Sequence, residues 1–150
     1  MKMFLIQFVC IFIAISIATL YLNSIKEKPK EVEIKGVENI NIKLDGENNN
    51  LIFNNNETIT DIMKMLPIED TMTNNDNELS LELKETIKSN PEKIEKASKG
   101  DVLLKDNKII IILENKELNN EYTKIGKVLL IDKLDNLKEK EKVKVVMRKG

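Results

Sequence analysis

The chain has 150 residues, of which 33% are charged, and its 24 lysines and arginines nearly balance its 25 aspartates and glutamates. This balance excludes the strongly basic face that nucleic-acid-binding proteins use, so no nucleic-acid partner is expected. There is no histidine and one cysteine, Cys10, so the commonest acid–base group and metal ligand is missing and an intramolecular disulfide is impossible.

An uncharged apolar run extends from Met3 to Leu22. About 20 apolar residues suffice for an α-helix to cross a bilayer, so we expect residues 1–24 to form a single-pass membrane anchor. A cleaved secretory signal is the alternative, although its apolar core usually has only about 7–15 residues; the protein would then be secreted. Lysines after the run favour a cytoplasmic C-terminal part, whereas the very short N-terminus before it is typical of a secretory signal. We expect the C-terminal part outside the cell membrane.

Residues 25–35 are polar and are expected to form a linker to a domain over 36–150. At its start, apolar and polar residues alternate through Ile40, Ile42 and Leu44, and an apolar return covers 51–53. Alternation around a turn predicts a β-hairpin. The turn is Asp45-Gly46, and Asn48–Asn50 are expected in a longer loop.

One helix is predicted clearly, over about 58–66. Its apolar residues recur at i, i+3, i+4 and i+7, namely Ile59, Ile62, Met63 and Leu66, which places them on one helix face. Thr58 is the expected N-cap, with Asp61 three residues later as in a weak capping box. Pro67 is expected to end the helix, because the residue before a proline avoids the α region.

Further strands are predicted where apolar residues alternate or run together: 79–83, 102–104, 109–113, 122–131 and 143–147. The unbroken run 109–113 indicates a strand that is buried on both faces. A tight turn at Asp106-Asn107 is expected before it, whereas residues 89–101 read as a connection. A short helix or turn is expected near 132–138. About seven or eight strands with one clear helix favour a closed β-barrel or sandwich over an α/β fold.

Two further predictions concern the strand that begins at residue 122 and the C-terminal strand. Asn119-Asn120 are expected to complete a turn before Tyr122, and Gly126 within a strand indicates a bulge or a close backbone approach. Lysine alternates with valine over 142–145. This pattern is typical of an edge strand protected against pairing; attraction to an anionic surface is the alternative.

Few residues in the sequence are candidates for catalysis, metal binding or cofactor binding. The neighbouring carboxylates Glu69-Asp70 and Asp76/Glu78 are expected in solvated loops, because a calcium loop needs more oxygen ligands at fixed positions and a glycine. Arg148 is the only arginine, and Phe53 and Tyr122 are the only aromatic residues after the apolar run. We therefore assign no catalytic residue, no cofactor-binding residue and no metal ligand, and expect no cofactor.

The order of these segments resembles the bacterial cyclophilin-like domain, a small eight-stranded β-barrel related in fold to the cyclophilins. The resemblance covers about residues 40–148. Its most specific pieces are Leu66-Pro67 at the helix end, Gly100-Asp101 before a strand, and the Tyr-x-x-Ile-Gly of residues 122–126.

Cyclophilins proper are peptidyl-prolyl isomerases, and the resemblance implies a site with an arginine at the prolyl amide beside an aromatic pocket. This chain departs from that pattern, because Arg148 lies in the last strand and no set of aromatics exists to form the pocket. We therefore expect a non-catalytic binding or interaction module with a protein or peptide partner in the envelope. The alternatives are a divergent isomerase or other enzyme on the same barrel, and an accessory subunit of an envelope complex.

Overall fold

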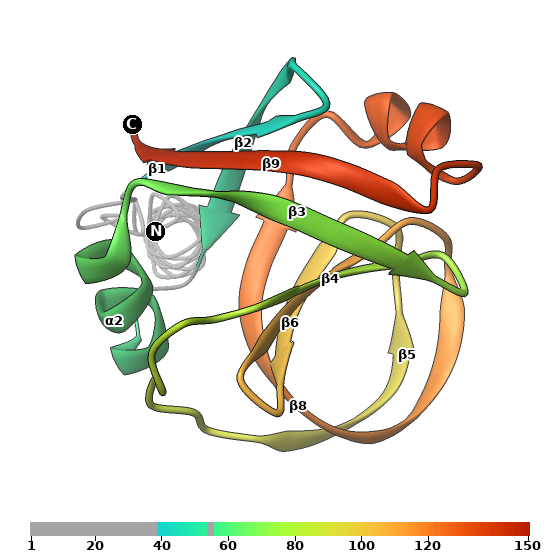
Figure 1. Cartoon of the computed structure of the whole chain (residues 1–150). Coiled ribbons are helices and arrows are strands. Elements are labelled where there is room, and N and C mark those ends of the chain that lie inside the picture. The colour runs from blue at the N-terminus through green and yellow to red at the C-terminus, as the bar shows by residue number, and fades with distance from the viewer. Residues whose placement is uncertain (1–38, 54–55) are drawn as a thin grey trace, which may run out of the picture. The chain divides into compact units, whose positions relative to one another are not determined.

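The computed structural model describes residues 39–53 and 56–150, which form a curved sheet with two helices (Figure 1). The predicted anchor (1–24) and linker (25–35) lie outside these residues. No helix in the described part is long and apolar enough to cross a membrane.

The described residues contain nine strands. In chain order they are β1 (Asn39–Leu44), β2 (Glu47–Phe53), β3 (Ile68–Asn75), β4 (Glu78–Glu82), β5 (Glu92–Ala97), β6 (Asp101–Lys105), β7 (Lys108–Ile112), β8 (Lys116–Val128) and β9 (Lys142–Lys149). All their pairings are antiparallel. The prediction of a mainly β fold is confirmed.

Eight of the strands form a closed ring. Their order is β2-β1-β9-β3-β4-β7-β6-β8, and pairing of β8 with β2 returns to the start. Closure removes the exposed strand edges that would otherwise invite pairing with another chain. The ninth strand, β5, pairs only with the first half of β8 and lies outside the ring.

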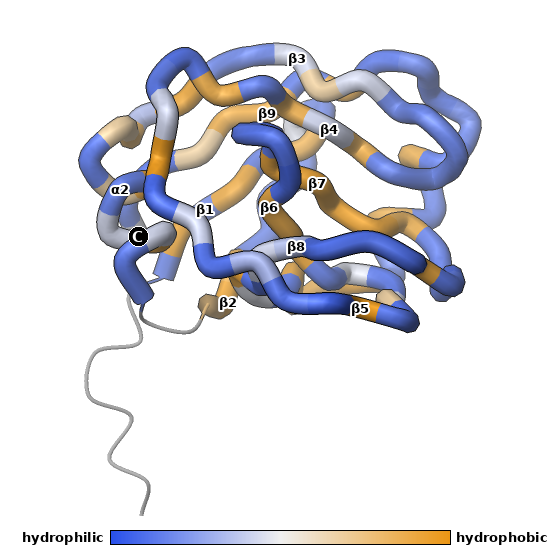
Figure 2. Tube along the Cα trace, turned by 90° about the horizontal axis from the view of Figure 1, so that it is seen from below, coloured by the Kyte–Doolittle hydropathy of each residue, from blue (hydrophilic) through white to orange (hydrophobic). Residues whose placement is uncertain are grey.

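Aliphatic side chains fill the barrel. Ile42 of β1, Leu79 of β4 and Ile111 of β7 are completely buried in one continuous core. Successive side chains of a strand point to opposite faces, so alternating sequences place one apolar set inside; Figure 2 shows the resulting alternation of hydrophobic and hydrophilic residues.

Two helices pack against this core. Helix α2 covers Glu57–Met65, and the 3-10 helix η1 covers Ile131–Leu137. Their residues in the core are Ile59, Ile62, Leu134 and Leu137. The predictions of a helix over 58–66 and of a short helix near 132–138 are confirmed to within one residue at each boundary.

A second core lies on the outer face of β6 and β7. The ribbon of β5 and the first half of β8 covers this face, and the buried cluster between them consists of Ile94, Ala97, Leu103, Ile110, Ile112, Leu118 and Tyr122. Strand β7 is therefore buried on both faces, as its unbroken apolar run predicted. The ring of Tyr122 belongs to this cluster and lies under the ammonium of Lys105, which is 5.3 Å from the ring centroid.

Gly126 permits the ring to close. Here β8 pairs with β2, and the register of its ladder with β6 shifts between Val102 and Leu103. A Cβ on Gly126 would clash with the carbonyl oxygen of Ile52 and would lie 2.7 Å from Cα of Phe53. The predicted bulge and close backbone approach are confirmed.

Two predicted loops are strands. Residues 89–101 contain β5, whose buried residues Ile94 and Ala97 are three apart instead of two, because the ladder shifts register between Ile94 and Lys96. Period-two alternation is therefore missing from its sequence. The stretch with Glu69 and Asp70 belongs to β3, which buries only Met72 and is held by backbone pairing with β9.

Three further local predictions were wrong. Asn48–Asn50 lie within β2, because the Asp45-Gly46 turn has only two residues. Asn119-Asn120 lie within β8, where they pair with β5 and make no turn. The C-terminal strand β9 lies between β1 and β3, so it is an interior strand and its lysines protect no edge.

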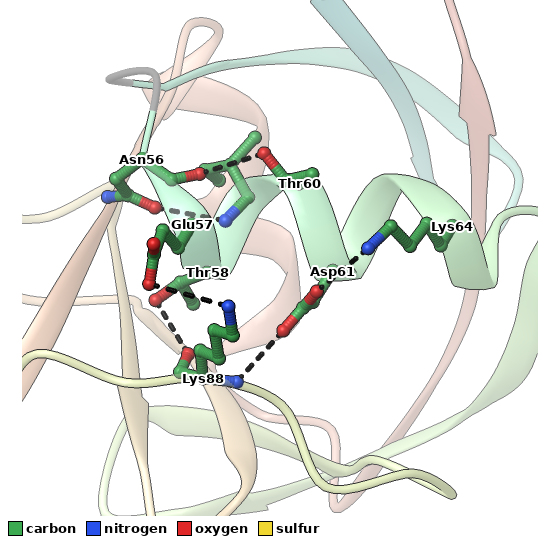
Figure 3. A network of polar contacts seen from close by, with 8 residues as sticks. Asn56, Glu57, Thr58, Thr60, Asp61, Lys64 and Lys88 are labelled. Atoms are coloured by element: carbon green, nitrogen blue, oxygen red, sulfur yellow. Dashed lines mark hydrogen bonds and ion pairs between the residues drawn. The ribbon is translucent and has the colours of Figure 1, made fainter.

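The N-cap of α2 is Asn56, not Thr58. The Asn56 side chain accepts a hydrogen bond from the backbone N–H of Ile59 at 2.9 Å, as an N-cap does. The hydroxyl of Thr58 instead donates to the carbonyl of Lys88 at 2.7 Å (Figure 3). The sequence prediction named Thr58 alone, and the contact that engages its hydroxyl is tertiary.

The β1–β2 turn is fixed by one carboxylate. Asp45 accepts hydrogen bonds from Nζ of Lys140 at 2.6 Å and from the backbone N–H of Lys144 at 2.7 Å. These two donors, the lysine side chain first, hold the pKa of Asp45 below its ordinary value. The turn is thereby tied to the start of β9.

Replacing Gly126 by alanine is expected to lower the free energy of unfolding by about 2–4 kcal/mol, because the methyl group meets backbone that cannot move aside. Gly46→Ala is the control. Gly46 has a φ of +84° but no atom near its missing Cβ, so only backbone strain of about 1 kcal/mol applies. Urea unfolding of both variants provides the measurement, and equal losses would contradict the close approach.

Asp45→Asn should destabilise the protein at neutral pH, and the difference from the parent should shrink in acid. A carboxyl with a lowered folded-state pKa contributes stability above its unfolded pKa of about 3.9, and this stability is lost as the pH falls through the folded value. Unfolding measured from pH 7 down to pH 2 tests this. Asp106→Asn, at a turn where the carboxylate bonds to no described residue, controls for loss of a charge. If the difference in the free energy of unfolding between Asp45→Asn and the parent persisted unchanged in acid, the role of Asp45 would be contradicted.

Candidate functional site

One cavity in the described part of the chain has a volume of about 610 Å³. It lies between the connection that precedes β5, the β6–β7 turn and the middle of β8. Apolar residues Ile87, Pro91 and Leu104 line it together with polar side chains from all three segments. Two smaller cavities are lined by the end of α2 with β3 and the end of β4 (280 Å³) and by β2, β5, β6 and β8 (480 Å³).

Asn107 builds one wall of the 610 Å³ cavity. Its Nδ2 donates to the carbonyls of Leu83 at 3.2 Å and of Glu85 at 3.0 Å, and its Oδ1 accepts from the N–H of Ile87 at 3.2 Å. Asn107 and Asp106 have φ values of +61° and +50°, a left-handed conformation that asparagine and aspartate tolerate in two-residue hairpin turns. The turn residue thus anchors the neighbouring connection by three side-chain hydrogen bonds.

Helix α2 and β8 hold the rest of the connection. The backbone N–H of Lys88 donates to Oδ2 of Asp61 at 3.0 Å, and the N–H of Asn90 donates to the hydroxyl of Thr123 at 3.0 Å. Thr58 of the helix donates to the Lys88 carbonyl, so helix and connection exchange bonds in both directions (Figure 3). The cavity wall is therefore preformed.

The polar lining of this cavity is mixed in charge. It contains Lys93 and Lys105 against Asp106 and Glu121, with amides and hydroxyls between them. The side chains of residues 119–120 are exposed. Such a lining offers donors and acceptors side by side, as the amides of a polypeptide require. A phosphate site would need an excess of cations or a cradle of backbone N–H groups.

The groups with shifted pKa values lie elsewhere. Hydrogen bonds lower the pKa of Asp61, chiefly from the N–H of Lys88, and lower that of Asp135, chiefly from Nζ of Lys99. Partial burial opposes the charged form of Lys116, yet bonds to Glu78 and Asp76 raise its pKa. Asp45 in the β1–β2 turn is the fourth such group. None of the four lines any of the three cavities.

Three of the four carboxylates singled out in the sequence make ion pairs, and the fourth, Asp70, accepts a hydrogen bond from the backbone N–H of Thr71 at 2.8 Å. Glu69 lies 3.1 Å from Arg148, and Asp76 and Glu78 lie 3.2 and 3.1 Å from Nζ of Lys116. Within residues 39–53 and 56–150, no three acidic or cysteine side chains converge in a way that would hold a metal ion.

The arginine and the two aromatic residues occupy three different environments. Arg148 is exposed in its pair with Glu69, Phe53 is buried in the barrel core, and Tyr122 is buried in the outer cluster. The structure therefore does not bring them together into the arginine-and-aromatic site that the resemblance implies for true isomerases.

Sequence reasoning missed the cavity. The turn at Asp106-Asn107 was predicted, but its hold on residues 83–87 depends on tertiary contact. Asn119-Asn120 were assigned to a turn, whereas they lie in β8 and, with Glu121, line the cavity. The sequence signal for this part of the cavity was the polar run between two apolar residues, Leu118 and Tyr122, which are both buried in the structure.

Asn107→Asp is expected to lower the free energy of unfolding by about 1–3 kcal/mol, because the carbonyls of Leu83 and Glu85 lose their donor and face a carboxylate. Asn119→Asp makes the same chemical change at an exposed position and should cost less than about 0.5 kcal/mol. Urea unfolding compares the two, and hydrogen exchange at the Ile87 amide reports the wall itself. Unchanged stability and unchanged hydrogen exchange in Asn107→Asp would contradict the role of Asn107 in holding the cavity wall.

The comparisons with known proteins give a fold and a family. The sequence profile of the Cyclophilin-like family matches residues 42–148, which is most of the chain. No curated protein matches the sequence. The solution structure of a hypothetical protein from Archaeoglobus fulgidus superimposes with a TM-score of 0.53 and 18% identity, covering 79% of this chain and 100% of the other; at that identity the likeness shows the fold alone. The chain belongs to the cyclophilin-like family.

Proposed function

We propose that this protein is a membrane-tethered, extracytoplasmic binding module without catalytic activity, which holds an extended peptide segment of an envelope protein in the 610 Å³ cavity. One observation carries the proposal: the cavity is preformed by hydrogen bonds in its wall and is lined by mixed donors and acceptors.

The residues that line the cavity favour a peptide over a small charged ligand. Side-chain amides at 119 and 120 and the hydroxyls of Thr86 and Ser89 match the alternating N–H and C=O groups of an extended chain. Ile87 and Leu104 supply apolar surface for its side chains. Polar groups that fix orientation on a largely preformed apolar base are the usual composition of a binding site.

The tether rests on the apolar run Met3–Leu22, which is long enough to span a bilayer. The outer side is favoured because the uncharged apolar run resembles a secretory signal, which directs the chain that follows it across the membrane. A domain held this way acts at the membrane surface, where its effective concentration toward a membrane-associated partner is high.

A proline-isomerisation assay tests the absence of catalysis. The detergent-solubilised full chain, added to a proline-containing peptide, should give the same cis–trans rate as a boiled sample. The uncatalysed barrier is about 18–20 kcal/mol, so even weak catalysis is visible. A rate above the boiled control that is retained through purification would restore the enzyme alternative.

Peptide display against the full chain in detergent tests the binding. Peptides selected from a random library should lose about thirtyfold in affinity when Asn119 and Asn120 are both changed to alanine, since each hydrogen bond is worth about 1 kcal/mol. Asn41→Ala, an exposed asparagine on β1 outside this cavity, should leave affinity unchanged. Selected peptides with equal affinity for all three proteins would place binding elsewhere, and a failure to select any peptide would contradict the peptide assignment.

A further inference from the structure

The large hydrophobic side chains that remain exposed in the described part of the chain gather in one place. They are Ile52 (38% exposed), Leu129 (50%), Leu130 (47%) and Ile131 (42%). Ile52 belongs to β2, and residues 129–131 follow β8, its neighbour in the barrel. We call these four residues the apolar patch. Exposed apolar side chains that lie on neighbouring segments mark a protein or membrane contact more often than singly scattered ones do.

Hydrogen bonds hold the backbone of the patch in place. The side chain of Asn49 is buried; its Oδ1 accepts from the N–H of Leu130 at 3.0 Å and its Nδ2 donates to the Leu130 carbonyl at 3.1 Å. The N–H of Leu129 donates to the carbonyl of Asn50 at 2.9 Å. A buried asparagine thus fixes the backbone of a leucine whose side chain faces solvent.

The patch continues into the 480 Å³ groove between β2, β5, β6 and β8. Ile52 and Leu129 line this groove with further apolar residues. Its charged residues are three lysines and one aspartate: Lys96, Lys124, Lys127 and Asp101. Lys127 lies 3.4 Å from Asp101, while Lys96 makes no ion pair with any described residue. Lys124 pairs with Glu92 at 3.4 Å, and both side chains are more than half exposed. The surface therefore combines apolar side chains with an excess of positive charge.

The described domain begins beside this patch. Asn39, its first residue, is the register partner of Ile52 in the β1–β2 ladder. Residues 23–38 separate it from the apolar run Met3–Leu22. Sixteen residues reach at most about 55 Å when fully extended. A bilayer that held the run would therefore lie within reach of the patch.

We propose that the apolar patch and the lysines of the adjoining groove rest on the surface of an anionic bilayer, an inference that depends on the membrane tether proposed above. The four aliphatic side chains enter the headgroup region, as apolar faces of interfacial segments do. The lysines meet anionic headgroups, which attract each nearby cation. The 610 Å³ peptide cavity has no residue in common with this surface.

Tryptophan fluorescence tests this directly, because the chain has no tryptophan. Leu129→Trp places a single reporter in the patch. Glu82→Trp is the matched control, since β4 lies half-way round the ring from β2. The full-length variants are reconstituted into vesicles of phosphatidylcholine and phosphatidylglycerol, in which part of the phosphatidylcholine carries brominated acyl chains that quench tryptophan on contact.

The emission of Leu129→Trp should be blue-shifted and quenched several-fold more than that of Glu82→Trp. The excess quenching of Leu129→Trp should fall when phosphatidylglycerol is omitted. It should also fall when Lys96 and Lys124 are changed to glutamine, because each lysine lost should weaken the equilibrium constant for membrane contact by about fivefold. Leu130→Trp repeats the test at a neighbouring position if Leu129→Trp unfolds, as circular dichroism would reveal.

Three results would overturn the proposal in distinguishable ways. Equal quenching at positions 129 and 82 in a chain that floats with the vesicles would agree with the tether but would contradict the membrane-facing surface. A blue shift at 129 without quenching by brominated lipid would mean that a second copy of the chain covers the patch. A chain that does not float with the vesicles would remove both the tether and the contact.

Discussion

The close approach of two backbones at Gly126 is the constraint on which the rest of the structure depends. Strand β8 has 13 residues and pairs with β5 over its first half and with β2 at its end. The exchange of partners requires β2 to come within contact distance of β8, which a side chain at 126 would prevent. If that ladder did not form, the ring would stay open and the core between β2 and β8 would meet water.

The same exchange of partners creates both surfaces that we consider functional. Where the first half of β8 leaves the barrel with β5, the ribbon covers the apolar outer face of β6 and β7 and leaves a concave surface at either side. One holds the 610 Å³ cavity, closed by Asn107 and the connection before β5. The other is the 480 Å³ groove bordered by Ile52 and Leu129. A barrel of simple hairpins would have offered neither.

The two surfaces differ in a way that suits separate tasks. The larger cavity has balanced charges and many amide and hydroxyl groups, so its contacts would be directional hydrogen bonds that select a partner. The groove and its patch carry aliphatic side chains and surplus lysines, whose attractions are non-directional and suit a fluid surface. A domain that rests on lipid through one surface would keep the other available for a partner.

The sequence by itself determined the mainly β fold, both helices, the tight turn at Asp106-Asn107 and the special role of Gly126, because alternation, helical period, turn chemistry and a lone strand glycine are local signals. Only the tertiary structure decided that 89–101 contains a strand, since β5 is stabilised by pairing with β8 and its ladder shift destroys the period-two pattern. It also decided that Asn56 caps the helix, that β9 is interior, and that residues 119–121 line a cavity. These depend on which segments meet, and partners far apart along the chain leave no trace in local periodicity.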